Sequence, residues 1–232
     1  MIEYAFPAPN LSSVPVAGAN VAFPVHRIYC VGRNYAAHAR EMGFDPDREL
    51  PFFFCKPADA VVENGSTIPY ALATESLEHE IELVVAIGRE GRDIAREAAL
   101  DYVYGYSVGI DLTRRDLQLA ARDKGRPWDT GKAFDQSAPL SAIRRASEIG
   151  HPAAGAIWLE VNEESRQKAD LNQLIWPVAD VIAQLSQLFL LKPGDLVFTG
   201  TPAGVGPVRP GDRVRGGIAG VGEISIQIGP RG

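Results

Sequence analysis

The sequence predicts an α+β fold in which β-strands dominate, a barrel or roll with a few helices packed on the outside. Short apolar segments follow one another along the 232 residues, separated by turns rich in glycine and proline, as is typical of a protein built from many short strands. Only a few segments have the character of helices, so these are expected around the strands. No linker and no internal repeat divides the chain, which favours one domain.

The first half of the chain is expected to contain short strands and two helices. Residues 1–25 are rich in Pro, Ala, Ser and Val and are expected to form an irregular lead-in with room for one edge strand, before a domain at 26–232. Asn34 can cap a helix from Tyr35 to Met42, and a second helix is expected near 93–100. The expected strands of this half are apolar and lie at 27–32, 77–88 and 103–112.

The second half is expected to contain a hairpin between two helices. Thr113 is placed to cap a helix over 113–125. The segment 156–167 is expected to form a hairpin that turns at Asn162. An apolar helix within 174–191 is expected to start near Pro177, because proline is tolerated in a first turn. The remaining tail alternates Pro-Gly-Asp turns with strands.

Composition and charge exclude several classes of function. The formal net charge is −6, and no basic patch is present, so nucleic-acid binding is not expected. No apolar run approaches the ~20 residues of a membrane-spanning helix. The N-terminus lacks the basic start and apolar core of a secretory signal. The sequence therefore predicts a cytoplasmic protein that binds neither nucleic acid nor membrane.

Carboxylates line one face of the strand expected at 77–88. Glu80 and Glu82 are two residues apart, and such residues share a side of a strand. Either this strand ends in water, or a cation neutralises two acids that would otherwise repel each other. Asp111, at the end of another apolar strand, adds a third acid whose alternative role is to cap the following helix. Because oxygen ligands favour Mg²⁺, Mn²⁺ or Ca²⁺ over zinc, these three residues are candidate metal ligands.

Two pairs of residues at helical spacing are candidates for catalysis and binding. His38 and Glu41 are three apart on an expected helix, and a carboxylate beside an imidazole holds its tautomer and raises its basicity. Such a pair suits a base that activates water, and a surface pair without function is the alternative. Arg115 and Gln118 share a face in the same way, and an arginine can hold a carboxylate at two points.

Lys132 and the loop around Thr201 are the remaining candidates. Lys132 stands among small and apolar residues; a desolvated lysine there could neutralise an enolate or a carboxylate, and an exposed loop lysine is the alternative. The glycine-rich segment 198–207 lacks the Gly-Lys-Ser/Thr of a P-loop. Its backbone N–H groups and the Thr201 hydroxyl could still face an anion, and an ordinary tight loop is again the alternative.

The order of these segments resembles the successive signature blocks of the fumarylacetoacetate hydrolase family. The resemblance runs from about residue 26 to 228 and is greatest with the single-domain acylpyruvase branch. It implies a mixed β-roll and a homodimer. The blocks are GRNYAAHAREM, FFFCKPADAV, LEHEIELVVAIG, GYSVGIDLTRRDLQ, GRPWDTGKAFDQSAPLS and LVFTGTPAGVGPV.

The same resemblance implies a role for each candidate residue. The implied metal is Mg²⁺ or Mn²⁺, with Ca²⁺ as a further possibility. The implied positions are Glu80, Glu82 and Asp111 for the metal, His38 with Glu41 for water activation, Lys132 for the active-site lysine, and Arg115, Gln118 and Thr201 for substrate binding.

The implied reaction is hydrolysis of the C3–C4 bond of an acylpyruvate, a 2,4-diketo acid. The blocks near the N-terminus are most similar to bacterial sequences that cleave fumarylpyruvate to fumarate and pyruvate in gentisate breakdown. Arg33, Lys56 and Arg126 are candidates to bind the terminal carboxylate, and the sequence does not rank them. The alternatives are an oxaloacetate decarboxylase, an isomerase or decarboxylase of 2-hydroxyhepta-2,4-diene-1,7-dioate, and a binding module without catalysis, which the complete set of candidate residues disfavours.

Overall fold

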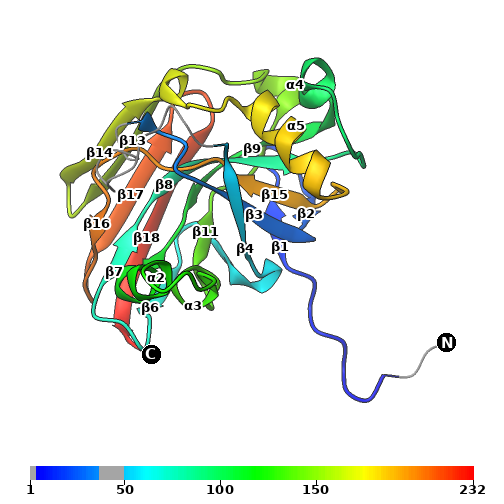
Figure 1. The fold of residues 1–232 in the computed structure, drawn as a ribbon. Helices are drawn as coiled ribbons and strands as arrows, with labels where there is room; N and C mark the ends of the chain where they lie inside the picture. The colour runs from blue at the N-terminus through cyan, green and yellow to red at the C-terminus, as the bar shows by residue number, and fades with distance from the viewer. Residues whose placement is uncertain (1–3, 37–49) are drawn as a thin grey trace.

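Two mixed β-sheets form the body of the protein, with an apolar core between them (Figure 1). The computed structural model describes residues 4–36 and 50–232. The eight-stranded sheet contains β4 (Phe52–Lys56), β3 (Arg27–Gly32), β15 (Asp195–Phe198), β8 (Ile81–Ile87), β9 (Val103–Ile110), β11 (Ala138–Leu140) and β5 (Val61–Glu63) in that order, with β12 (Arg144–Arg145) paired to β9. The five-stranded sheet has the order β14 (Glu164–Asp170), β13 (Ala156–Val161), β17 (Arg213–Ile218), β18 (Gly222–Arg231) and β6 (Thr67–Tyr70).

Strand β8 lies between β15 and β9, and all of its residues are buried. Its side chains alternate between two cores, as those of a strand must. Leu83 and Val85 pack in the core between the two sheets. Val84 and Ala86 pack in a second core on the other face of the eight-stranded sheet. Both faces of β8 are covered by other parts of the protein, which explains why its sequence is almost continuously apolar. The face that carries Glu82 continues with Val84 and Ala86 into the second core.

The N-terminal segment contributes to this second core. We expected an irregular lead-in at 1–25 with room for one edge strand, but two strands pair there, β1 (Ser13–Pro15) and β2 (Ala22–Pro24). Val14 and Phe23, from their centres, are buried in the second core. Residues 4–12, before β1, extend away from the body (Figure 1).

The helices lie at the edges of the sheets (Figure 1). Helix α5 (Val178–Leu188) begins after Pro177 as predicted, and the predicted hairpin is β13 and β14 with Asn162 in the left-handed region at its turn. The segment predicted as a helix at 93–100 is instead a 3₁₀ helix, η2 (Arg96–Tyr102). The remaining helices of the described residues are α2 (Arg115–Arg122), α3 (Asp129–Lys132), α4 (Ala146–Ile149), η1 (Ala58–Ala60) and η3 (Leu171–Gln173).

A three-stranded sheet joins the start of β8 to helix α2. Its order is β10 (Thr113–Arg114), β7 (Leu77–His79) and β16 (Gly206–Pro207). Thr113 was predicted to cap α2, but it pairs with Glu78 in this sheet, and α2 begins two residues later without a side-chain cap. The predicted β-rich α+β class is confirmed. Within the described ranges, no helix has the length and apolar character needed to cross a membrane.

Candidate metal centre and active site

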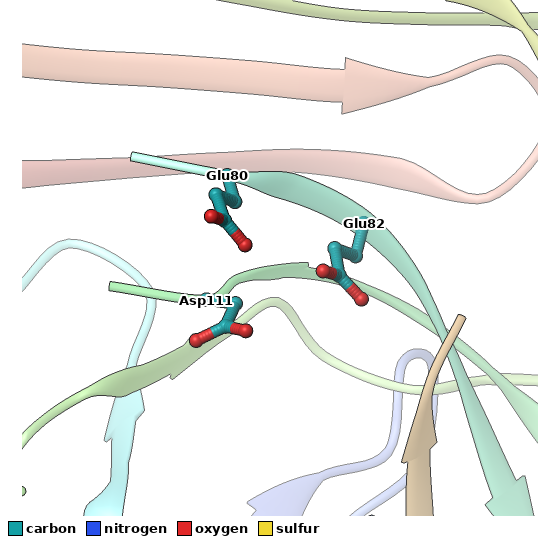
Figure 2. A group of neighbouring side chains, drawn as sticks. All are labelled: Glu80, Glu82 and Asp111. Atoms are coloured by element: carbon teal, nitrogen blue, oxygen red, sulfur yellow. The ribbon is translucent and has the colours of Figure 1, made fainter. Parts of the chain in front are cut away.

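Three buried carboxylates converge where β8 begins and β9 ends. Glu80 directly precedes β8, Glu82 is its second residue, and Asp111 directly follows β9. The antiparallel pairing of these strands sets Ile81 opposite Ile110, and the Asp111 N–H donates to the Glu80 carbonyl at 2.8 Å. Ligand oxygens of the three side chains lie within 4.8 Å of one another, and Figure 2 shows the three side chains gathered where the two strands lie side by side. The structure thus brings the three predicted metal ligands together.

The electrostatics of this cluster favour an added cation. Glu82 is 2% exposed, and burial, followed by the charges of Asp111 and Glu80, holds the pKa of its carboxyl well above the usual range. Among the residues that the structure describes, no lysine or arginine forms an ion pair with Glu82. Its Oε2 accepts a hydrogen bond from the Gly200 N–H at 2.7 Å. A divalent cation would offset both the cost of burying this carboxylate and its repulsion by Asp111 and Glu80.

The donor set fits a hard divalent ion. Asp111 Oδ1 is buried, and the Lys56 ammonium lies 2.8 Å from it. A carboxylate oxygen with one such partner retains a lone pair for a metal. Three carboxylates with no sulfur or imidazole suit Mg²⁺ or Mn²⁺. The residues present therefore match the metal predicted from the sequence.

Lys132 joins two of these acids. It lies at the end of α3 and is 2% exposed. Its Nζ donates to Glu80 Oε2 at 2.7 Å, to Asp111 Oδ2 at 2.7 Å and to Thr113 Oγ1 at 2.6 Å. Burial alone would lower the pKa of this lysine, but the charges of Asp111 and Glu80 outweigh burial and raise it. Lys132 is therefore a fixed positive charge within the site, not an exposed loop lysine.

A close contact between two helices sets the position of Lys132. A Cβ atom added at Gly131 would lie 2.8 Å from the backbone nitrogen of Gln118. Only glycine allows α3 to approach α2 so closely, because any side chain would push the two backbones apart. The glycine next to Lys132 thus determines how deeply the lysine enters the site.

Arg115 and Gln118 face the acids from α2, as the helical spacing predicted. The Arg115 guanidinium donates from Nε to Glu78 Oε2 at 2.7 Å, and it also contacts Glu80 Oε1 and Gln118 Oε1. Burial alone would lower the pKa of Arg115, but the charges of Glu80 and Glu78 raise it above its usual value. Because the Gln118 oxygen accepts from Arg115, its NH₂ group remains as a donor.

The loop after β15 closes the site on a further side. Gly200 has φ +98°, and a Cβ atom there would lie 2.7 Å from Asn34 Cβ, so this position requires glycine. The Thr201 hydroxyl donates to the Ile81 carbonyl at 2.8 Å and accepts from Gln167 Nε2 at 2.8 Å. The hydroxyl proton is therefore used to hold the loop against β8, while Thr201 itself lines the cavity.

Lys56 has a role that the sequence did not indicate. We considered it as a ligand for a substrate carboxylate, but it is 2% exposed and lines neither of the cavities at the site. Its ammonium lies against Asp111 and donates to the carbonyls of Leu112 and Lys132. Lys56 therefore contacts Asp111 from outside the cavity. In the sequence, this role was indicated only by the position of a lysine within a strongly apolar segment.

The acids open into a small cavity of about 40 Å³, which is enough for an ion and very few waters. Its lining includes Arg33, Phe52, Phe54, Glu80, Glu82, Asp111, Arg115, Gln118, Arg122, Trp128, Lys132 and Thr201. Predicted substrate-binding residues from three separate segments therefore border the three acids. The aromatic residues and Arg122 in this lining were not predicted. His38 and Glu41, the predicted base and its partner, lie outside the described residues.

The chain matches known proteins over most of its length. A family model described as fumarylacetoacetate (FAA) hydrolase, C-terminal, matches residues 27–228. A fumarylpyruvate hydrolase from Ralstonia sp is 45% identical over 186 residues, which are 80% of this chain and 96% of that protein. A mitochondrial oxaloacetate tautomerase from Arabidopsis thaliana is 40% identical over 202 residues, covering 87% of this chain and 90% of that protein.

A solved structure is similar over almost the whole fold. The crystal structure of fumarylpyruvate hydrolase from Pseudomonas aeruginosa in complex with Mn²⁺ and pyruvate superposes with a TM-score of 0.97. Its sequence is 54% identical, and the match covers 99% of this chain and 100% of that one.

Proposed function

Because the chain belongs to the fumarylacetoacetate hydrolase family, we propose that it is a metal-dependent hydrolase of the C3–C4 bond of acylpyruvates, with fumarylpyruvate as its substrate. The products are fumarate and pyruvate. The observation that carries this proposal is the convergence of three buried carboxylates within 4.8 Å, bordered by an arginine, a glutamine and a lysine, in a chain similar to a fumarylpyruvate hydrolase that binds Mn²⁺ and pyruvate.

We assign the metal to Glu80, Glu82 and Asp111. A divalent cation held there would polarise the oxygens of an α-keto acid and favour the release of an enolate. Arg115 and Gln118 are assigned to the carboxylate of the pyruvate half, because a guanidinium and an amide N–H bordering one cavity suit that group. Thr201 shapes the wall of the cavity beside them.

The reaction needs a base and a positive charge at opposite ends of the breaking bond. We assign His38, oriented by Glu41, to remove a proton from the water that attacks the C4 carbonyl; this assignment rests on the GRNYAAHAREM block alone. The C3–C4 bond then breaks, its electrons pass to C3 and the C2 oxygen, and protonation of C3 gives pyruvate. The buried ammonium of Lys132 is assigned to stabilise this developing enolate charge.

An oxaloacetate tautomerase or decarboxylase is the second candidate, because the mitochondrial tautomerase relative is 40% identical. Both reactions pass through an enolate of a 2-keto acid, so the same acids and Lys132 would serve them. Neither reaction needs an activated water. Decarboxylation also needs no base, so His38→Ala is expected to abolish hydrolysis and to leave much of any decarboxylation of oxaloacetate. An equal loss of both would contradict the role given to His38.

The decisive measurement is the loss of fumarylpyruvate absorbance with purified protein. We expect turnover with Mg²⁺ or Mn²⁺, its loss in EDTA, and its return when metal is added in excess. Glu82→Gln should keep the fold and lose metal-dependent turnover, whereas Glu223→Gln, a control at an exposed acid, should keep both. A protein that turns over oxaloacetate but no acylpyruvate would establish the second candidate instead.

The assembly, location and pathway follow as further parts of the proposal. A homodimer is the assembly that the resemblance to the family implies, and it is part of this proposal. Light scattering on the purified protein would measure its mass. A cytoplasmic location and a step in gentisate breakdown agree with the proposed substrate, and fractionation of the source cells and growth on gentisate after gene deletion would test them.

A further inference from the structure

We propose that a second, outer cavity binds the acyl arm of the substrate and that Arg126 binds its terminal carboxylate. This inference rests on the proposed function, because it identifies what the site selects among acylpyruvates. It assigns a binding role to a residue that lies away from the three acids.

The small size of the inner cavity favours such an extension. About 40 Å³ beside the acids holds an ion with very few waters, and this is too little for a diketo acid with a four-carbon acyl arm. The outer cavity has a volume of about 500 Å³. Both cavities are bordered by the same five residues, which are Arg33, Phe52, Phe54, Trp128 and Lys132. The two cavities are therefore adjacent, and the lysine assigned to the enolate is among the residues that border both.

The aromatic residues that border both cavities are suited to a flat unsaturated chain. The Phe52 ring packs edge-on against Trp128 with centroids 5.2 Å apart, and Phe54 lies at 5.8 Å from the same indole. Three aromatic side chains from two segments thus form an apolar surface at the junction. An alkene conjugated to a carbonyl can lie against such a surface without leaving a polar group unpaired.

The charged residues that line the outer cavity favour the binding of an anion. Arg33, Arg126 and Lys132 line it, and Asp129 is the acid among its lining residues. Lys132 is bound to Glu80 and Asp111. Arg33 lies at the junction, because it borders both cavities, and its guanidinium carbon is 5.2 Å from the Phe52 ring centre.

Arg126 differs from the other cations by its position. It borders the outer cavity alone, and among the described residues its guanidinium forms no salt bridge. The terminal carboxylate of fumarylpyruvate is the group farthest from the bond that breaks, so it is expected at the outer end. Of the three candidates that the sequence left unranked, Lys56 is buried against Asp111 and Arg33 lies nearer the reacting atoms. Arg126 is the candidate that borders the outer cavity and not the inner one.

The test compares two substrates that differ only in the terminal group. Fumarylpyruvate ends in a carboxylate, and crotonylpyruvate carries a methyl group there on the same conjugated chain. Arg126→Ala is expected to lower kcat/KM for fumarylpyruvate by about 10- to 100-fold, the effect of losing a hydrogen-bonded ion pair. The loss should appear mainly in KM, since Arg126 is remote from the reacting bond. Activity on crotonylpyruvate should be nearly unchanged, and Arg126→Lys should restore part of the fumarylpyruvate activity.

Lys124→Ala is the matched control, because Lys124 is an exposed cation two residues away that lines neither cavity. It should leave both substrates unaffected. Equal changes for the two substrates in Arg126→Ala, or no change in either, would overturn the role of Arg126 while leaving the proposed function standing. A wild-type protein that cleaves neither substrate would overturn the proposed function and this inference together.

Discussion

Replacing Lys132 by methionine tests whether the site depends on balanced buried charge. Methionine has a similar length and no charge, so the substitution removes a cation without opening a large cavity. The wild-type cluster contains four acids and three bases, a formal sum of −4 + 3 = −1, and the variant has −4 + 2 = −2. The acids are Glu78, Glu80, Glu82 and Asp111, and the bases are Lys56, Arg115 and Lys132.

The expected magnitude follows from the contacts that are lost. Lys132 makes two charge-assisted hydrogen bonds of 2.7 Å in a site where it is 2% exposed. Removing one partner from a buried ion pair costs about 3–5 kcal/mol of unfolding free energy. In a chain of this length each kcal/mol changes the Tm by about 2–4 °C, so we expect a decrease of roughly 6–20 °C in EDTA.

Added metal should reduce this difference between variant and wild type. A divalent cation among the acids supplies positive charge that the variant lacks, and a ligand that binds only the folded state stabilises it according to its affinity. With the lysine charge gone, the ion also meets less repulsion. We therefore expect Mn²⁺ to raise the unfolding free energy of Lys132→Met by more than that of the wild type.

Urea unfolding in EDTA and in saturating Mn²⁺ measures both effects. Lys124→Met, at an exposed lysine, is the matched control and should follow the wild type in both buffers. We also expect kcat to fall by about 10²–10³, as on loss of a preorganised donor to a developing oxyanion. A stability loss below about 1 kcal/mol in EDTA, or a difference that widens with Mn²⁺, would refute the charge-balance reasoning.

Three further predictions concern residues around the acids. The pKa of Glu82 is raised above its usual 4.5. In EDTA, its contribution to the unfolding free energy is therefore present below pH 4.5 and is lost as the pH rises through the raised pKa. Urea titrations at several pH values should show this decline in wild type and a weaker one in Glu82→Gln. Gly131→Ala should lower kcat/KM by at least about tenfold, because a Cβ atom 2.8 Å from the Gln118 nitrogen forces α3 outward, and unchanged kinetics would show that α3 adjusts freely. Gln167→Leu should lower the unfolding free energy by about 2–4 kcal/mol and should also lower kcat, because it removes the amide that donates to Thr201 and Pro202. A thermal melt and an activity assay test this. A loss of stability with full kcat would limit Gln167 to a structural role.

The strand periodicity was the most informative part of the sequence. Side chains two apart share a face, so Glu80 and Glu82 could be expected to converge, and Asp111 followed from its place at the end of another apolar strand. The structure brings all three together because β8 and β9 are neighbours in the sheet. Helical spacing likewise placed Arg115 and Gln118 on one face of α2.

What the sequence missed depended on contacts between distant segments. Threonine is a common helix N-cap, but Thr113 pairs with β7 as part of a strand, and its hydroxyl accepts a hydrogen bond from Lys132. Lys56 lies in an apolar segment 55 residues before Asp111, and only the folded sheets show that it supports that acid. Local patterns contain no information about such partners, so tertiary pairing decided these positions.

The buried ion pairs have a consequence for how this site can change during evolution. From Lys56 through Asp111, Lys132, Glu80 and Arg115 to Glu78, each charge contacts neighbours of the opposite sign. A mutation at one member leaves an adjacent charge without its counterion, so single replacements are disfavoured and accepted ones should occur in pairs. Sequences of descendants that lose the lysine at 132 are therefore expected to have lost an acid as well, and such coupled substitutions would mark lineages whose chemistry has moved away from enolates.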